Sequence, residues 1–147
     1  VLRETGDAAG ARREYQRALT AAGGKPTLSM MVGLAHSAYA AGEHGEAIAA
    51  YRRVLGVDAS LPRVRLRLAH ALLRRDKKGD VADALEVLDA VPDAASDRTE
   101  LALLRALAAA RSGDRKKARA TVDALSAARE THPDLMDELE AVLGRST

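Results

Sequence analysis

The sequence contains one short pattern four times: a glycine followed five residues later by an alanine. The glycines stand 36, 37 and 34 residues apart, a period typical of two-helix units that stack into a solenoid. An acidic residue follows each of these glycines. The four pairs are Gly6 and Ala11, Gly42 and Ala47, Gly79 and Ala84, and Gly113 and Ala118. Such a chain must repeat one local structure along its length.

The chemistry of this pattern predicts a pair of helices in each unit. Glycine adopts the left-handed conformation that ends a first helix, and the acidic residue suits the positive N-terminal end of a second helix. From the alanine onward, apolar residues recur at plus four and plus seven, as in Ala47, Tyr51 and Val54. This spacing predicts one buried stripe on an amphipathic helix. Alanine heads the stripe because a larger side chain would overpack a close helix contact, at about 1–3 kcal/mol.

The composition favours an all-α fold. Alanine, leucine, arginine and glutamate are strong helix formers, whereas aromatic residues make up only 2% of the chain. We expect a single domain over residues 1–147. Its predicted parts are a partial first unit at 1–24, full units at 25–60, 61–95 and 96–131, and a capping helix at 132–147. The predicted helices cover residues 1–5, 8–22, 27–41, 44–56, 61–77, 80–91, 97–112, 115–130 and 133–143.

The two ends of the array differ. Residues 133–143 place large apolar residues beside acidic ones, which is typical of a last helix that covers the open end of a solenoid. Only five residues precede Gly6, so the first unit lacks most of its first helix, and we interpret the chain as a fragment or as part of a longer array. The apolar side of helix 8–22 is then partly uncovered. Self-association through this N-terminal side is one hypothesis, which light scattering at several protein concentrations tests.

Several classes of protein are disfavoured. The 23 basic and 21 acidic residues give a net charge of +2, which does not by itself indicate nucleic-acid binding. Cysteine is absent, which leaves the redox compartment undetermined. Nothing resembles a signal peptide, and no stretch offers the ~20 apolar residues of a membrane span. The compartment is therefore unknown, with the cytoplasm as the default. We find no phosphate loop, no zinc-protease or serine-hydrolase motif and no isolated carboxylate pair. We therefore expect no enzyme activity, no cofactor and no metal site in these residues.

Two segments carry a family resemblance. Residues 33–55 (GLAHSAYAAGEHGEAIAAYRRVL) and 6–19 (GDAAGARREYQRAL) resemble the tetratricopeptide repeat family, in the manner of bacterial-type arrays. The resemblance implies a right-handed superhelix of antiparallel helix pairs, whose first helices line a concave groove that binds a peptide or helix of another protein. The chain departs from the family because tryptophan is absent and Ala59 stands where a proline is frequent. The first helix of the third unit is also about one turn longer, with Lys77 and Lys78 in the added turn.

The resemblance also implies which residues line the groove. Aligned with the family, the groove positions are Ser29, Val32, His36 and Tyr39 in the second unit, Arg63, Leu66, Arg67, His70 and Arg74 in the third, and Glu100, Leu103, Leu107 and Arg111 in the fourth. The arginines of the third unit are spaced by four and seven residues and share one helical face. Guanidinium groups pair well with carboxylates, so an acidic peptide is our sharper hypothesis for the partner. The alternative is that these arginines form an ordinary solvated face.

Three other interpretations stay open. His36 and His70 occupy equivalent positions in neighbouring units and could face one another in a metal or pH-sensitive site, but no third ligand is spaced to join them. The basic segment 63–78 could bind RNA, although aromatic residues for stacking are almost absent. The array could also be an accessory or regulatory module of a larger enzyme. We favour a protein-binding scaffold, with nucleic acid as the less favoured partner.

Overall fold

A computed structural model describes the backbone at residues 2–92 and 98–144, and all regular structure in these ranges is α-helical. The expected all-α class is confirmed. Side chains at positions 2–9, 11 and 12 lie outside the described part, and so does the prediction that Ala11 heads a buried stripe. The helices are α1 (Leu2–Ala21), α2 (Leu28–Ala40), α3 (His44–Val57), α4 (Pro62–Arg75), α5 (Asp80–Asp89), α6 (Arg98–Arg111), α7 (Arg115–Ala124), α8 (Ala128–Thr131) and α9 (Pro133–Gly144).

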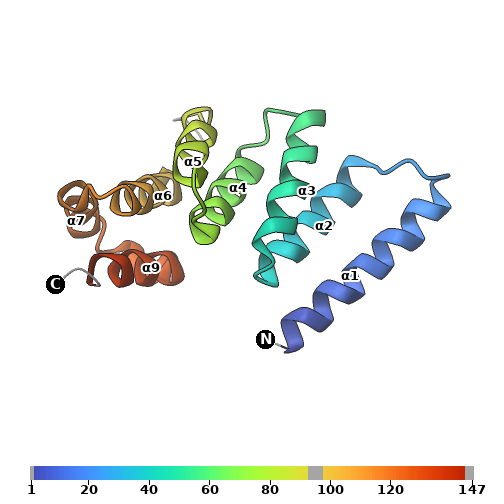
Figure 1. Ribbon diagram of the computed structural model, residues 1–147, viewed down its shortest axis with the longest axis horizontal. Coiled ribbons are helices and arrows are strands. Elements are labelled where there is room, and N and C mark those ends of the chain that lie inside the picture. Colours follow the sequence, from blue (N-terminus) through green and yellow to red (C-terminus); the bar gives the residue numbers. More distant parts are fainter. Residues whose placement is uncertain (1, 93–97, 145–147) are drawn as a thin grey trace.

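The helices pack in the order in which they follow one another along the chain (Figure 1). Helix α2 packs on α3, α4 on α5 and α6 on α7, and these pairs are the second, third and fourth units. Each pair joins the next one because α3 packs on α4 and α5 packs on α6. The first helices α2, α4 and α6 are also neighbours, and α9 follows α6 in this row. We call the surface formed by α2, α4, α6 and α9 the first-helix face.

Glycine turns join the helices within the second and fourth units. Gly42 and Gly113 have φ angles of 76° and 96°. The residue after Gly42, Glu43, donates its backbone N–H to the carbonyl of Ala38 at 3.0 Å, and an equivalent bond forms after Gly113. These bonds satisfy carbonyl groups that a helix end leaves free, so each glycine ends one helix and directs the chain into the next.

Small residues allow the helices to approach closely. Ala47, Ala84 and Ala118, each five residues after a glycine of the repeat, are fully buried. Leucine, valine, isoleucine and further alanine side chains form one continuous core around them, with Tyr51 as its largest fully buried member. A longer side chain at an alanine position would therefore push two packed helices apart.

Two predicted helix boundaries are wrong. Helix α1 continues through Gly6, in place of the predicted segment 1–5 and a separate helix at 8–22. Glycine permits the left-handed conformation without requiring it, and a glycine inside a helix costs only about 1 kcal/mol relative to alanine. The helix predicted over 115–130 is divided into α7 and α8, because Leu125 leaves the helical conformation with φ −112° and ψ 33°.

The added helical turn predicted at the end of α4 is also wrong. Helix α4 ends at Arg75, because Asp76 takes the left-handed conformation with φ 51°. Lys77 and Lys78 therefore lie in the turn that leads to Gly79 and α5. Most of the extra residues of this unit form the turn between α4 and α5.

The C-terminal helix α9 packs on α6 and α7, as expected of a helix that covers the end of the array. Its apolar residues Leu135, Met136, Leu139 and Leu143 are buried. The sequence predicts that the acidic residues of this helix point outward. Glu138 does not, and its contacts are described with the candidate site.

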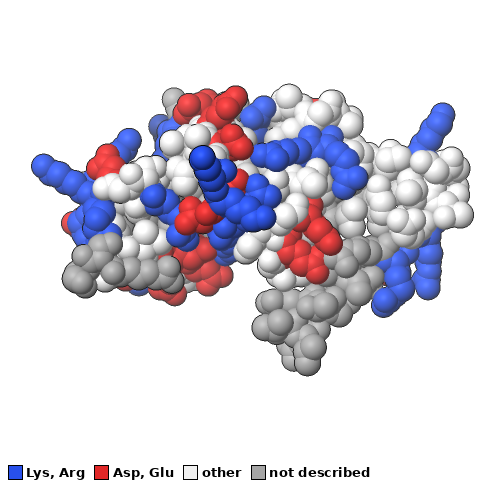
Figure 2. Space-filling view, in the orientation of Figure 1, with Lys and Arg blue, Asp and Glu red and all other residues white. Residues whose placement is uncertain are grey.

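Charged residues of both signs share the surface. Figure 2 shows Lys and Arg side chains beside Asp and Glu side chains over the part of the molecule that carries α4 to α9. Exposed pairs such as Arg52 with Asp83, at 3.4 Å, join neighbouring units. An exposed pair contributes at most about 1 kcal/mol, so the packing of the core holds the units together more than surface charge does.

Two alanine substitutions on α3 test the role of the repeated alanine. Ala47 is fully buried whereas Ala49 is exposed on the same helix. We expect Ala47→Leu to lower the free energy of unfolding by about 1–3 kcal/mol, because the larger side chain overpacks the helix contact. Ala49→Leu is the matched control and should change it by less than about 0.5 kcal/mol. Urea unfolding followed by circular dichroism measures both variants. Equal losses of stability would contradict the side of α3 that is assigned to the core.

Candidate functional site

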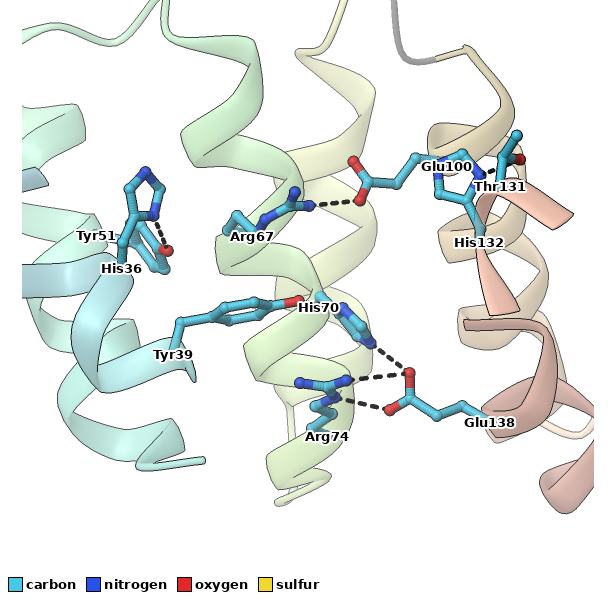
Figure 3. Close-up of polar contacts among 10 residues, drawn as sticks. All are labelled: His36, Tyr39, Tyr51, Arg67, His70, Arg74, Glu100, Thr131, His132 and Glu138. Atoms are coloured by element: carbon cyan, nitrogen blue, oxygen red, sulfur yellow. Dashed lines mark hydrogen bonds and ion pairs between the residues drawn. The ribbon is translucent and has the colours of Figure 1, made fainter. Parts of the chain in front are cut away.

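Helix α4 carries three polar side chains, from its middle to its last turn, that face the neighbouring helices. Helix α4 begins at Pro62, whose fixed φ suits the first position of a helix, and its leucine and alanine side chains are buried. Arg67, His70 and Arg74 follow one another at three and four residues and point toward α2, α6 and α9 (Figure 3). We call these three residues the basic stripe. Each of them meets a side chain from another helix.

Glu138 of α9 binds two members of the basic stripe. Its Oε2 accepts a hydrogen bond from Nε2 of His70 at 2.6 Å, and its Oε1 accepts one from Nε of Arg74 at 2.7 Å. A second nitrogen of Arg74, Nη2, lies 3.4 Å from Oε2, so the guanidinium group approaches both carboxylate oxygens. Burial opposes the charged form of Glu138, but the hydrogen bonds and charges of His70 and Arg74 prevail and lower its pKa to about 2.

His70 extends this network to α2. Its Nδ1 lies 2.7 Å from the hydroxyl of Tyr39. Nε2 donates to Glu138, and the hydroxyl of Tyr39, which can both donate and accept, completes the hydrogen bond at Nδ1. Burial raises the pKa of Tyr39, so its hydroxyl keeps its proton. Tyr39, His70 and Glu138 thus form a continuous chain of hydrogen bonds from α2 to α9 across α4.

The ring of Tyr39 also meets both arginines of the basic stripe. The guanidinium carbons of Arg67 and Arg74 lie 5.6 and 5.4 Å from the ring centre. These distances are within the range of cation–π contacts, which contribute about 0.5–1 kcal/mol at exposed sites and more where water is excluded. The aromatic side chain of α2 therefore helps to fix the direction in which the basic stripe points.

The other arginines predicted to line the groove differ from one another in their partners. Arg67 donates from Nη1 to Oε1 of the buried Glu100 on α6, so the basic stripe has a second carboxylate partner. Arg111, at the end of α6, donates from Nη1 to Oδ2 of Asp76 at 3.2 Å. Arg63, at the start of α4, is exposed and has no carboxylate partner among the described residues.

The two histidines do not face one another across a groove. A hydrogen bond of 2.5 Å joins Nδ1 of His36 and the hydroxyl of Tyr51. Burial and the charges of Arg67 and Arg63 lower the pKa of His36, so its neutral form is favoured. His70 uses both ring nitrogens in hydrogen bonds, which leaves neither for a metal ion. Within the described ranges, no group of three or more His, Cys, Asp or Glu is placed to hold a metal.

The remaining predicted groove positions differ in how exposed they are. Ser29 is exposed and Val32 is half-buried on α2. Leu66, Leu103 and Leu107 are completely buried, so the prediction that they line an open groove is wrong. The reason is that α4 and α6 are enclosed by their neighbours, since α3 and α5 pack on α4 while α7 and α9 pack on α6.

A hollow of about 220 Å³ remains on the first-helix face beside the basic stripe. Tyr39 and the basic stripe line one side, and Glu100 with residues 131–135 line the other. The arginines of this hollow already bind carboxylates of the same chain. An additional acidic group would therefore have to compete with Glu100 or Glu138.

Sequence reasoning missed Glu138 as a member of the site. It stands three residues after Leu135 and one before Leu139, so it shares the buried side of α9 with them. A carboxylate on a buried side needs a cation or several donors nearby, and this signal is present in the sequence. Its partners are not, because Arg74 lies 64 residues and His70 lies 68 residues away along the chain.

Helix pairs stacked in chain order and a continuous row of first helices define a helical-repeat protein of the solenoid class. Two family models, both described as tetratricopeptide repeat, match residues 1–62 and 38–108, and the chain belongs to this family. Repeats of this family are generally protein-interaction modules and are typically not catalytic. Comparisons with curated proteins and with solved structures found no match. In the described ranges, every helix is too short or too polar to span a bilayer.

Replacing Glu138 with glutamine tests the network. The pKa of this carboxyl falls from an ordinary value of 4.5 to about 2 in the folded chain. Its charge therefore stabilises the fold above about pH 4.5, and this contribution is lost as the pH falls toward 2. We expect Glu138→Gln to lower the free energy of unfolding by about 2 kcal/mol at pH 7, and the difference from wild type to vanish near pH 2.

The matched control for this test is Asp137→Asn. Asp137 is exposed on the same helix and faces only the exposed Arg129, at 3.6 Å. Its replacement should change stability by less than about 0.5 kcal/mol at any pH. Urea unfolding at pH 7, 5, 3 and 2 measures both variants. A deficit for Glu138→Gln that stays constant with pH would contradict the assigned charge interaction.

Proposed function

We propose that this chain is a scaffold that binds an acidic segment of a partner protein on the first-helix face, at the end formed by α2 and the start of α4. The observation that carries the proposal is the exposed Arg63, which has no carboxylate partner among the described residues. His36 lies within the electrostatic reach of Arg63, and the half-buried Val32 belongs to the same helix as His36. These residues offer a cation with an imidazole ring within its electrostatic reach.

Ion pairs within the chain make this end of the first-helix face a better candidate for partner binding than its middle. A partner carboxylate at Arg67 or Arg74 has to displace Glu100 or Glu138, which already make charge-assisted hydrogen bonds there. A partner carboxylate at Arg63 displaces only water. The acidic-peptide hypothesis is thereby narrowed from the three arginines predicted to line the groove on α4, Arg63, Arg67 and Arg74, to the first of them.

The RNA-binding alternative has less support. Arg74 and Arg75, in the basic segment 63–78, bind carboxylates of this chain. Arg65 donates from Nε to the backbone carbonyl of Ala59 at 2.9 Å. Affinity for nucleic acid comes from cations that replace counterions along the phosphate backbone, and cations paired with acids contribute little to it. The segment therefore offers RNA fewer free charges than its sequence indicates.

Charge reversal at Arg63 tests the proposal. We expect Arg63→Glu to reduce capture of the partner from a cell lysate by about tenfold, because the reversed charge repels an acidic segment. Arg119→Glu is the matched control, since Arg119 is exposed on α7, outside the first-helix face. Quantitative mass spectrometry of the captured proteins measures the effect, with circular dichroism to verify helicity. Unchanged capture by a folded Arg63→Glu variant, or an equal loss with Arg119→Glu, would refute this location.

A further inference from the structure

A second surface lies at the turn between α4 and α5, on residues that the first-helix face does not use. This turn carries Lys77 and Lys78 and borders the start of α5. We propose that the turn and Leu85 form a docking surface for a partner segment in which carboxylates flank an aliphatic side chain. The residues differ from those around Arg63, so this proposal does not depend on the proposed function.

The turn is held in one conformation before any partner binds. Asp76 has φ 51°, and in the described ranges it is the one residue other than glycine with a positive φ. Its carboxylate accepts a hydrogen bond from Arg111 at 3.2 Å, which ties the turn to the end of α6. On the other side, the buried Asp80 accepts two bonds of 2.8 Å from Arg75 and one of 3.0 Å from the backbone N–H of Lys77. A turn ordered in advance loses little conformational entropy on binding.

An apolar floor lies beside this turn. Leu85 is 38% exposed and, with Val57, is one of two large apolar side chains exposed in the described part of the chain. Leu85, Val81 and Ala82 line a hollow of about 470 Å³ that extends to Ser112 at the end of α6. A partner that covers Leu85 removes this apolar surface from water, which favours association.

The rim of the hollow is positively charged. Lys77 and Lys78 are exposed, and neither has a carboxylate partner among the described residues. The acidic residues of the same turn do not neutralise them, because Asp76 and Asp80 already bind arginines. Asp83, on the following turn of α5, faces Arg52 of α3.

The charges of Lys77 and Lys78 determine which kind of partner segment suits this surface. Unpaired ammonium groups beside an aliphatic floor favour a segment with carboxylates on either side of a leucine-like residue. A basic segment would be repelled by the lysines, and a purely polar segment would leave Leu85 exposed to water. The structure thus assigns to this turn a recognition role different from that of the basic stripe, whose cations are satisfied within the chain.

The test is a titration of the ¹⁵N-labelled full chain with a defined peptide, acetyl-EELLEE-amide, followed by amide chemical shifts. We expect shifts at Lys77, Lys78, Ala82 and Leu85. The peptide acetyl-QQLLQQ-amide, which lacks the carboxylates, should bind about tenfold more weakly. Shifts that are absent, or that occur only around His36 and Arg63 on the first-helix face, would overturn the proposal. The second pattern would leave the proposed function standing, so the two can fail separately.

Two test variants and one matched control complete the test. The double substitution of Lys77→Glu with Lys78→Glu should weaken binding of acetyl-EELLEE-amide by about tenfold or more. The same charge change at Lys116 and Lys117, which are adjacent and exposed on α7, is the matched control and should leave the affinity unchanged. Leu85→Ser tests the floor without any change of charge and should also weaken binding. Equal losses in control and test variants, or the same amide shifts on concentrating the protein alone, would overturn the proposal, the latter by identifying a second copy as the occupant.

Discussion

The carboxylate of Glu138 is the contact on which the first-helix face depends. It accepts hydrogen bonds from His70 and Arg74 of α4, and through His70 it reaches the hydroxyl of Tyr39 on α2. Three helices are thus joined by one half-buried charge, while Leu135 and Leu139 on the same side of α9 pack into the core. Burying a charge is costly unless its partners are in place, so α9 cannot rotate or slide without losing these bonds. The position of the last helix and the charge at the middle of the first-helix face are therefore set by the same interaction.

Along α4 and the turn after it, this arrangement separates arginines that are paired within the chain from cations that are not. The arginines of the basic stripe are paired with Glu100 and Glu138, and they stabilise the array rather than extending free charge toward a ligand. Unpaired cations remain at the start of α4, at Arg63, and in the turn after it, at Lys77 and Lys78. Both proposed contacts follow from this distribution. A chain whose formal charge is only +2 can present cationic surfaces to partners because its acidic residues are used elsewhere.

Features within single repeat units predicted most of the fold, but contacts between residues far apart in the sequence could not be predicted. The glycine turns at Gly42 and Gly113 and the close contacts at Ala47, Ala84 and Ala118 depend on residues within one unit, so their spacing reveals them. The break predicted at Gly6 failed because glycine allows a turn without enforcing one. The groove predicted for α4 was incomplete because the acids that occupy it come from other units. The alanine repeat indicates which helices are adjacent. No local pattern indicates that Glu138 forms hydrogen bonds with His70 and Arg74.

The most direct measurement of this central interaction is a double-mutant cycle between Arg74 and Glu138, with Arg74→Gln, Glu138→Gln and the double variant unfolded in urea at pH 7. If the carboxylate is held as described, the coupling free energy is above about 1 kcal/mol, within the range of about 0.5–3 kcal/mol found for residues in one hydrogen-bond network. The same cycle on the exposed pair of Arg52 and Asp83 should give a coupling below about 0.5 kcal/mol. Additive effects at Arg74 and Glu138, with a coupling no larger than that of the exposed pair, would contradict the account.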